Sequence, residues 1–297
     1  MALKDFFVAI QVQNTGITDA IGAVFFGVGL FEIILCLLLI IAFIIYFNDP
    51  NIRRSAPRIT MLILLGVLFL ATSEMLYSIG KSDAICTISS LLYHAGMSIL
   101  LTGLCVKNFR IYRIFSNKQA TAINISENRL ILVMVVLTGV YMLAIIVPFC
   151  IFGFKALVIQ STQSIYYRYV NCQFDNEIMN AVFQFYTQIF ICILILINLI
   201  LAWLTRKVKA DFRETNPLVA ISIIILATYV IFIPLGLTFT QQVNSETLKF
   251  VINEELLTII AVSALVILFI PKIIKIRRNS RRGNRLSGRL SDDLSNE

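Results

Sequence analysis

Residues 21–47 read IGAVFFGVGLFEIILCLLLIIAFIIYF, an apolar stretch interrupted by a single charged residue, Glu32. The hydrocarbon core of a bilayer is about 30 Å thick, and a helix needs roughly 20 apolar residues to cross it. Only a helix satisfies all of its backbone hydrogen bonds within one such segment. This stretch is therefore predicted to be a transmembrane helix.

Further apolar runs follow along the whole chain. They lie at about residues 59–80, 84–106, 129–154, 178–204, 217–239 and 254–274, and the third helix is predicted to continue to residue 115. The composition agrees, because 58% of the residues are hydrophobic and only 14% are charged, unlike an average soluble protein. We expect an all-α membrane protein, a bundle of seven transmembrane helices.

The positive charges predict the orientation of the bundle. Of the 25 Lys and Arg residues, only Lys4, Lys81, Lys155, Arg168 and Lys249 fall in the N-terminal segment and the alternate loops that share its side. Cytoplasmic loops are the ones enriched in Lys and Arg. The N-terminus is thus predicted outside and the C-terminus in the cytosol of a multi-pass plasma-membrane protein.

Three regions follow from this pattern. Residues 1–20 are expected to be a short extracellular segment, residues 21–276 the seven-helix domain, and residues 277–297 a disordered basic cytosolic tail. The net charge of +8 is explained by topology, so we expect anionic membrane lipid, and not nucleic acid, as the partner of the basic residues.

Two cysteines lie on the outer side, where disulfides persist. Cys86 is at the outer end of the third run, and Cys172 is in the long outer loop that precedes the fifth. We predict a bond between them that fixes this loop over the bundle. The alternative is a pair of unrelated thiols.

Polar residues inside the apolar runs are the candidates for a binding site, since ionisable groups in a membrane are expensive. The candidates for an internal pocket are Glu32, Glu74, Tyr93, His94, Gln184, Gln188 and Tyr229, together with Tyr141. Interhelical hydrogen bonds are an equally good explanation for each of them. One histidine cannot build a zinc site with these cysteines, and no catalytic motif is present. We expect no metal, no cofactor and no enzymatic activity.

The third run and its continuation carry a motif. Cys86, Gly96 and Lys107 are spaced along one predicted helix, and residues 106–115 read VKNFRIYRIF. This segment resembles the third helix of class C G-protein-coupled receptors, with its Lys-x-aromatic-Arg-x-aromatic-x-Ile-Phe pattern. The likeness is greatest to the metabotropic GABA receptor branch, in which the cysteine, the glycine and the lysine have the same spacing.

Helix ends elsewhere support the same likeness. Residues 54–57 (RSAP) resemble the family's entry to the second helix, and residues 201–208 (LAWLTRKV) resemble the exit from the fifth. Residues 269–272 (FIPK) are similar to the signature that closes the seventh helix.

The resemblance implies a receptor that transmits a signal to a heterotrimeric G protein, alone or as a homo- or heterodimer with another class C receptor. In this family the third-helix lysine pairs with an acid at the start of the sixth helix and closes the cytoplasmic face. Here the resemblance implies a pair between Lys107 and Glu214, and Asp211 is a competing partner for the lysine. The alternative is that Lys107 and Glu214 do not pair and both extend into water. The expected G-protein contacts are Arg53, Arg54, Arg110, Arg113, Arg206, Lys207 and Lys272. Possible phosphorylation sites in the tail are Ser280, Ser287 and Ser291.

Family members with known ligands bind them in a large extracellular domain, for which residues 1–20 leave no room. We therefore expect a fragment, a receptor active without ligand, a non-signalling partner subunit, or a ligand that enters the bundle. The alternative from another functional class is a transporter that binds a cation or proton at Glu32 and Glu74.

Overall fold

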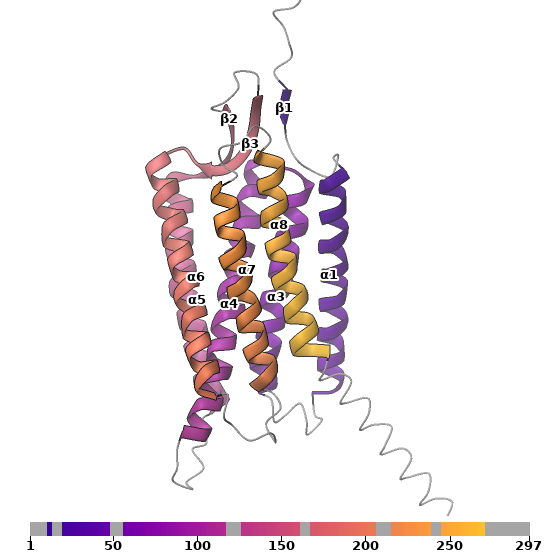
Figure 1. Ribbon diagram of the computed structural model, residues 1–297, viewed down its shortest axis with the longest axis vertical. Helices are drawn as coiled ribbons and strands as arrows, with labels where there is room; N and C mark the ends of the chain where they lie inside the picture. Colours follow the sequence, from indigo (N-terminus) through magenta and orange to yellow (C-terminus); the bar gives the residue numbers. More distant parts are fainter. Residues whose placement is uncertain are drawn as a thin grey trace, which may run out of the picture.

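The computed structural model describes residues 11–13, 20–47, 56–116, 126–160, 167–205, 215–238 and 245–270. In this part of the chain seven helices form a bundle, with short strands at one end (Figure 1). The helices are α1 (Ala20–Ile45), α3 (Pro57–Ile79), α4 (Asp83–Ser116), α5 (Glu127–Phe152), α6 (Glu177–Thr205), α7 (Thr215–Thr238) and α8 (Ser245–Ala264), which continues into the π-helical turn η2 (Leu265–Phe269). The predicted seven-helix bundle is confirmed.

Most of these helices are long and apolar enough to cross a membrane. Six described segments meet this condition by length and composition, and the apolar described part of α7, Pro217–Phe232, is shorter. Helix α4 packs against α3, α5, α6 and α7, whereas α8 closes the ring by contacting α1, α3 and α7. Helix α4 is therefore the central column of the bundle.

The strands form a small sheet at the end of the bundle that the charges predict to face outside, called here the outer end (Figure 1). They are β1 (Gln11–Gln13), β2 (Phe154–Gln160) and β3 (Tyr167–Phe174). Strand β2 pairs antiparallel with β3, and β1 adds to the free edge of β3 in parallel. The sequence predicted only a loop here, because strands this short depend on pairing and leave little periodic signal.

The start of the last helix also differs from the prediction. Helix α8 begins at Ser245, well before residue 254. The polar triplet Asn253, Glu254 and Glu255 ends the apolar run in the sequence, but the helix continues through it with Glu254 buried and its two neighbours exposed. The predicted tail, residues 277–297, lies outside the described residues.

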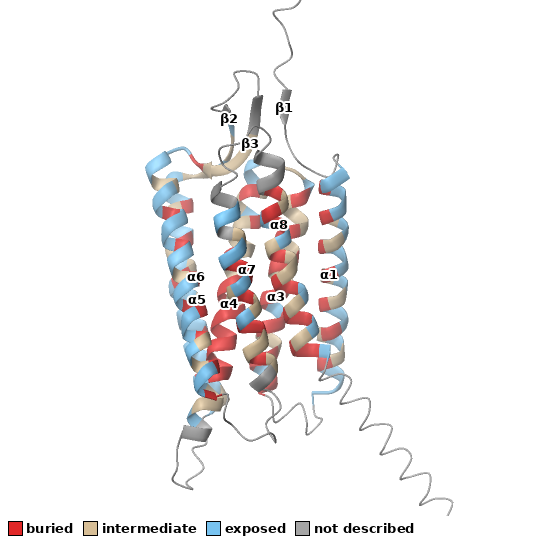
Figure 2. Cartoon of the chain, in the orientation of Figure 1, coloured by how far each residue is buried: buried red, intermediate tan, exposed pale blue. Residues whose placement is uncertain are grey.

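The outer surface of the bundle is apolar, unlike that of a soluble protein. Large apolar side chains such as Phe185, Trp203 and Ile178 are exposed on the outer surface. Buried residues line the interior faces of the helices, as the red segments of Figure 2 show. An apolar outer surface of this extent is stable only against lipid or another protein.

Close contact between α3 and α4 depends on two glycines. Gly66 and Gly96 face each other, and a Cβ added to Gly96 would lie 2.7 Å from the Gly66 carbonyl oxygen. Small residues let helix backbones approach closely in membrane proteins. The central glycine of the motif is thus a packing residue in this fold.

Candidate functional site

A disulfide attaches the outer sheet to the central helix. Cys86 in the first turns of α4 is bonded to Cys172 in β3, with the two Cα atoms 5.4 Å apart. The described free cysteines are Cys36, Cys105, Cys150 and Cys192, all within helices. The bond brings together segments that are 86 residues apart in the sequence.

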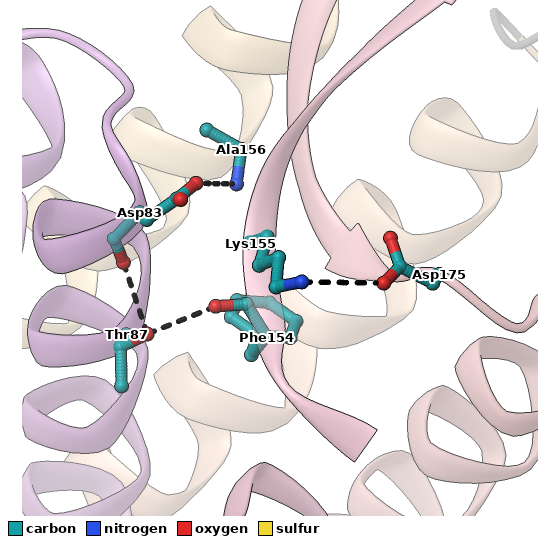
Figure 3. A network of polar contacts seen from close by, with 6 residues as sticks. All are labelled: Asp83, Thr87, Phe154, Lys155, Ala156 and Asp175. Carbon is teal, nitrogen blue, oxygen red and sulfur yellow. Dashed lines mark hydrogen bonds and ion pairs between the residues drawn. The ribbon is translucent and has the colours of Figure 1, made fainter.

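Hydrogen bonds reinforce the attachment of β2 to α4 (Figure 3). The Asp83 carboxylate accepts a 2.9 Å bond from the Ala156 amide, and the Thr87 hydroxyl lies 3.0 Å from the Phe154 carbonyl oxygen. An exposed ion pair between Lys155 and Asp175 spans 3.5 Å across the strands. Such an exposed pair contributes little, so the disulfide and the buried contacts hold the hairpin in place.

Aromatic rings fill the space beneath the hairpin. Phe154 and Phe174 from the strands pack against Phe149 of α5 and Phe183 of α6, with ring centroids 4.7–6.4 Å apart. Offset and edge-on ring pairs of this kind add stability beyond their buried area. A displacement of the hairpin would therefore reach α4, α5 and α6 together.

Four of the predicted pocket residues form two buried polar pairs. The Nδ1 atom of His94 lies 2.8 Å from the Tyr141 hydroxyl, and the hydroxyls of Tyr93 and Tyr229 are 3.1 Å apart. These contacts join α4 to α5 and α4 to α7. The structure thus places these four residues in interhelical hydrogen bonds, which was the alternative to a pocket.

Tyr141→Phe is expected to lower the free energy of unfolding by about 1–3 kcal/mol, because it leaves the buried His94 nitrogen without its partner. Thermal unfolding of the purified protein would measure the change. Tyr186→Phe is the matched control, since the Tyr186 ring stacks on Tyr141 but is 38% exposed. Equal unfolding temperatures for the two variants would contradict a stabilising His94–Tyr141 bond.

The two glutamines of the predicted pocket lie elsewhere. Gln184 and Gln188 are both exposed on the surface of α6, so they do not line the bundle interior with His94. Their spacing of four residues places them on one face of the helix, but nothing in the sequence indicates which face is buried. Among the described residues, no group of three or more His, Cys, Asp or Glu residues can hold a metal ion.

The structure buries a third acid in addition to the two predicted membrane acids. Glu32 of α1 and Glu74 of α3 are 1% and 0% exposed, and Glu254 of α8 is 1% exposed. The Thr258 hydroxyl donates a 2.7 Å hydrogen bond to Glu74. Glu254 was not among the predicted residues because it stands at the edge of an apolar run, next to the exposed Glu255.

The inner half of α4 carries the motif lysine and a polar contact to α6. Lys107 is only 7% exposed, and its neighbour Asn108 is fully buried. The Asn108 amide nitrogen donates a 3.2 Å bond to the Asn198 side-chain oxygen, and Asn198 donates a 3.1 Å bond to the Leu101 carbonyl. A crevice beside this contact has no room for a water molecule; it is lined by Leu101, Leu104, Ile195, Asn198, Ser222 and Ile225.

Part of the predicted cytoplasmic site can be placed. Arg110 is half-buried and Arg113 is exposed on the last turns of α4. The other predicted residues lie outside the described part of the chain: Glu214, Asp211, Arg53, Arg54, Arg206, Lys207, Lys272, Ser280, Ser287 and Ser291. The asparagine pair was not predicted, although a lone Asn198 within an apolar run was a signal for it.

Comparison with known proteins places this architecture in a family. The family described as "7 transmembrane sweet-taste receptor of 3 GCPR" matches residues 16–272. Metabotropic glutamate receptor-like protein M of Dictyostelium discoideum is 26% identical over 242 residues, which are 80% of this chain and 31% of that protein. Metabotropic glutamate receptor-like protein H of the same organism is 26% identical over 267 residues, which are 84% of this chain and 32% of that protein.

The chain spans about a third of the length of these two relatives. The family match, in contrast, extends from before α1 to beyond η2 and so includes every described helix. The chain therefore belongs to the seven-transmembrane family of class C G-protein-coupled receptors, a family of multi-pass membrane receptors and not of enzymes.

Proposed function

We propose that this bundle relays a conformational change from its outer surface to a heterotrimeric G protein on its cytosolic face. The observation that carries the proposal is the continuity of α4. This 34-residue helix begins beside the disulfide that holds the hairpin and ends beyond Lys107. At 1.5 Å per residue it is about 50 Å long, enough to connect both faces of a membrane.

The inner half of α4 contains the elements that a switch requires. Lys107 is almost fully buried, and Asn108 bonds to α6 through Asn198. Switching elements typically contain polar contacts between helices, and these contacts can adopt two discrete arrangements. We propose that Lys107 pairs with Glu214 in the closed state, and that Arg110 and Arg113 contact the G protein.

Nucleotide exchange tests this function. The reconstituted chain is expected to promote guanine-nucleotide exchange on at least one purified G protein, and Lys107→Ala is expected to change the basal rate because it removes one partner of the closed state. Lys155→Ala is the matched control, because Lys155 is half-exposed on the outer surface. No exchange on any G protein would instead favour a non-signalling partner subunit of a receptor dimer.

We also propose that the chain is closest to the metabotropic GABA receptor branch. The support is the spacing of Cys86, Gly96 and Lys107 on one helix, together with the packing role of Gly96 and the disulfide at Cys86. The similar proteins named above are described as metabotropic glutamate receptor-like. The proposed assignment to the GABA receptor branch is therefore supported only by these features of α4. Assembly with a second class C receptor is part of the same proposal, and co-purification of two differently tagged chains would test it.

A further inference from the structure

Three carboxyl groups are buried on α1, α3 and α8, which are helices that contact one another. Glu32 lies on the inward face of α1, in the series Gly22, Phe25, Gly29, Glu32, Cys36, Leu39 and Phe43, which are all buried. Glu74 of α3 and Glu254 of α8 are buried as well. The charge of each of the three carboxyls interacts with at least one of the others.

These carboxyls lack the hydrogen bonds that buried carboxylates require. Both oxygens of Glu32 and both oxygens of Glu254 are buried without a hydrogen-bond partner, and Glu74 has one partner, Thr258. Buried polar atoms are paired in the great majority of cases, and each exception needs an explanation. A buried carboxylate without partners is costly, whereas a protonated carboxyl carries no charge.

Among the side chains that the structure describes, the groups that interact with these carboxyls do not balance their charge. Lys81 is the described cation that interacts with Glu254, and it also donates a 2.9 Å bond to the Val170 carbonyl. Two further described groups interact with the carboxyls, and neither is a cation: Cys36 interacts with Glu32, and Glu255 interacts with Glu74. On α4 and α7, Tyr93 and Tyr229 bond to each other, and His94 bonds to Tyr141 of α5. Three ionised carboxylates beside one lysine would leave negative charge inside the membrane, which is strongly unfavourable.

We propose that Glu32, Glu74 and Glu254 form a proton-binding site, so that the packed arrangement of α1, α3 and α8 holds protons that a loosened arrangement releases. A metal ion does not fit as the neutralising group, because no set of three acidic, histidine or cysteine side chains among the described residues can hold one. Protons enter from the outer solution, since Glu74 and Glu254 lie in the outer halves of their helices. The site makes the stability of the bundle depend on external pH.

The sign of this dependence follows from linkage. The packed state binds more protons than the loosened state, so lower pH favours packing and rising pH weakens it. Each additional proton held by the packed state changes the ratio of packed to loosened molecules about tenfold per pH unit. This pH dependence of packing is lost when the three carboxyls cannot titrate.

Infrared spectroscopy of the purified protein tests the site directly. The wild type is expected to show the carbonyl band of protonated carboxylic acids at neutral pH, and each of Glu32→Gln, Glu74→Gln and Glu254→Gln is expected to remove part of it. Glu177→Gln is the matched control, since Glu177 is an exposed acid at the outer end of α6. A band that is absent, or unchanged in all three single variants, would overturn the proposal.

Thermal unfolding as a function of pH provides a second, independent readout. Between about pH 5.5 and about pH 8.5 the wild type is expected to lose stability as the pH rises, while a variant with all three substitutions shows a flatter profile. Stabilisation by sodium at constant pH, in place of a pH dependence, would also overturn the proton site in favour of a bound cation. Neither measurement requires a G protein, so a negative result here leaves the proposed signalling function untouched.

Discussion

Removing the disulfide by Cys86→Ser with Cys172→Ser is expected to lower the free energy of unfolding by about 2–5 kcal/mol. The bond closes a chain segment of 86 residues and holds β3 against the outer end of α4. Without it, the described contacts that still hold the hairpin are those of Asp83 and Thr87, the bond from Lys81 to the Val170 carbonyl, and the aromatic packing beneath it. Thermal unfolding of the purified variant, compared with the wild type under non-reducing conditions, measures the loss.

The control for this experiment is Cys150→Ser. Cys150 is a free cysteine exposed on the surface of α5, so its replacement changes a thiol without changing a cross-link. The control is expected to unfold close to the wild type, and reduction of the wild type is expected to reproduce the effect of the double substitution. A double variant as stable as the control would show that the hairpin is held by its noncovalent contacts.

Gly96→Ala is expected to destabilise the bundle by about 1–3 kcal/mol, because the added methyl group overpacks the contact between α3 and α4. Its Cβ would lie 2.7 Å from the Gly66 carbonyl oxygen and 2.8 Å from a Leu70 side-chain carbon. The nearer obstacle is backbone, which cannot rotate away as a side chain does. The two helices would have to separate, and thermal unfolding would measure the cost.

Gly139→Ala makes the same chemical change where space is open. A Cβ at Gly139 of α5 meets nothing within 4 Å, and alanine favours a helix over glycine by about 1 kcal/mol. This variant is expected to be neutral or more stable, so the two glycine variants should shift the unfolding temperature in different directions. Similar shifts in the same direction would contradict the close contact between α3 and α4.

The site was only partly predictable from the sequence. Glu32 and Glu74 stood out because a charge within an apolar run is rare. Glu254 did not, since a polar residue at the edge of a run is ambiguous until the helix is known to continue past it. Gln184 and Gln188 were placed correctly on one face of α6, but that face is the exposed one.

The sequence by itself determined the seven helices and their place in the membrane, because the length and apolarity of each run are local properties that the bilayer selects. It also carried the family motif on α4 and the asymmetry of positive charge. Only the tertiary structure decided which face of each helix is buried, that Gly96 lies against Gly66, and that one carboxyl each from α1, α3 and α8 is buried. In a membrane both faces of a helix can be apolar, so the hydrophobic pattern does not distinguish the lipid side from the protein side, and packing between helices must do so.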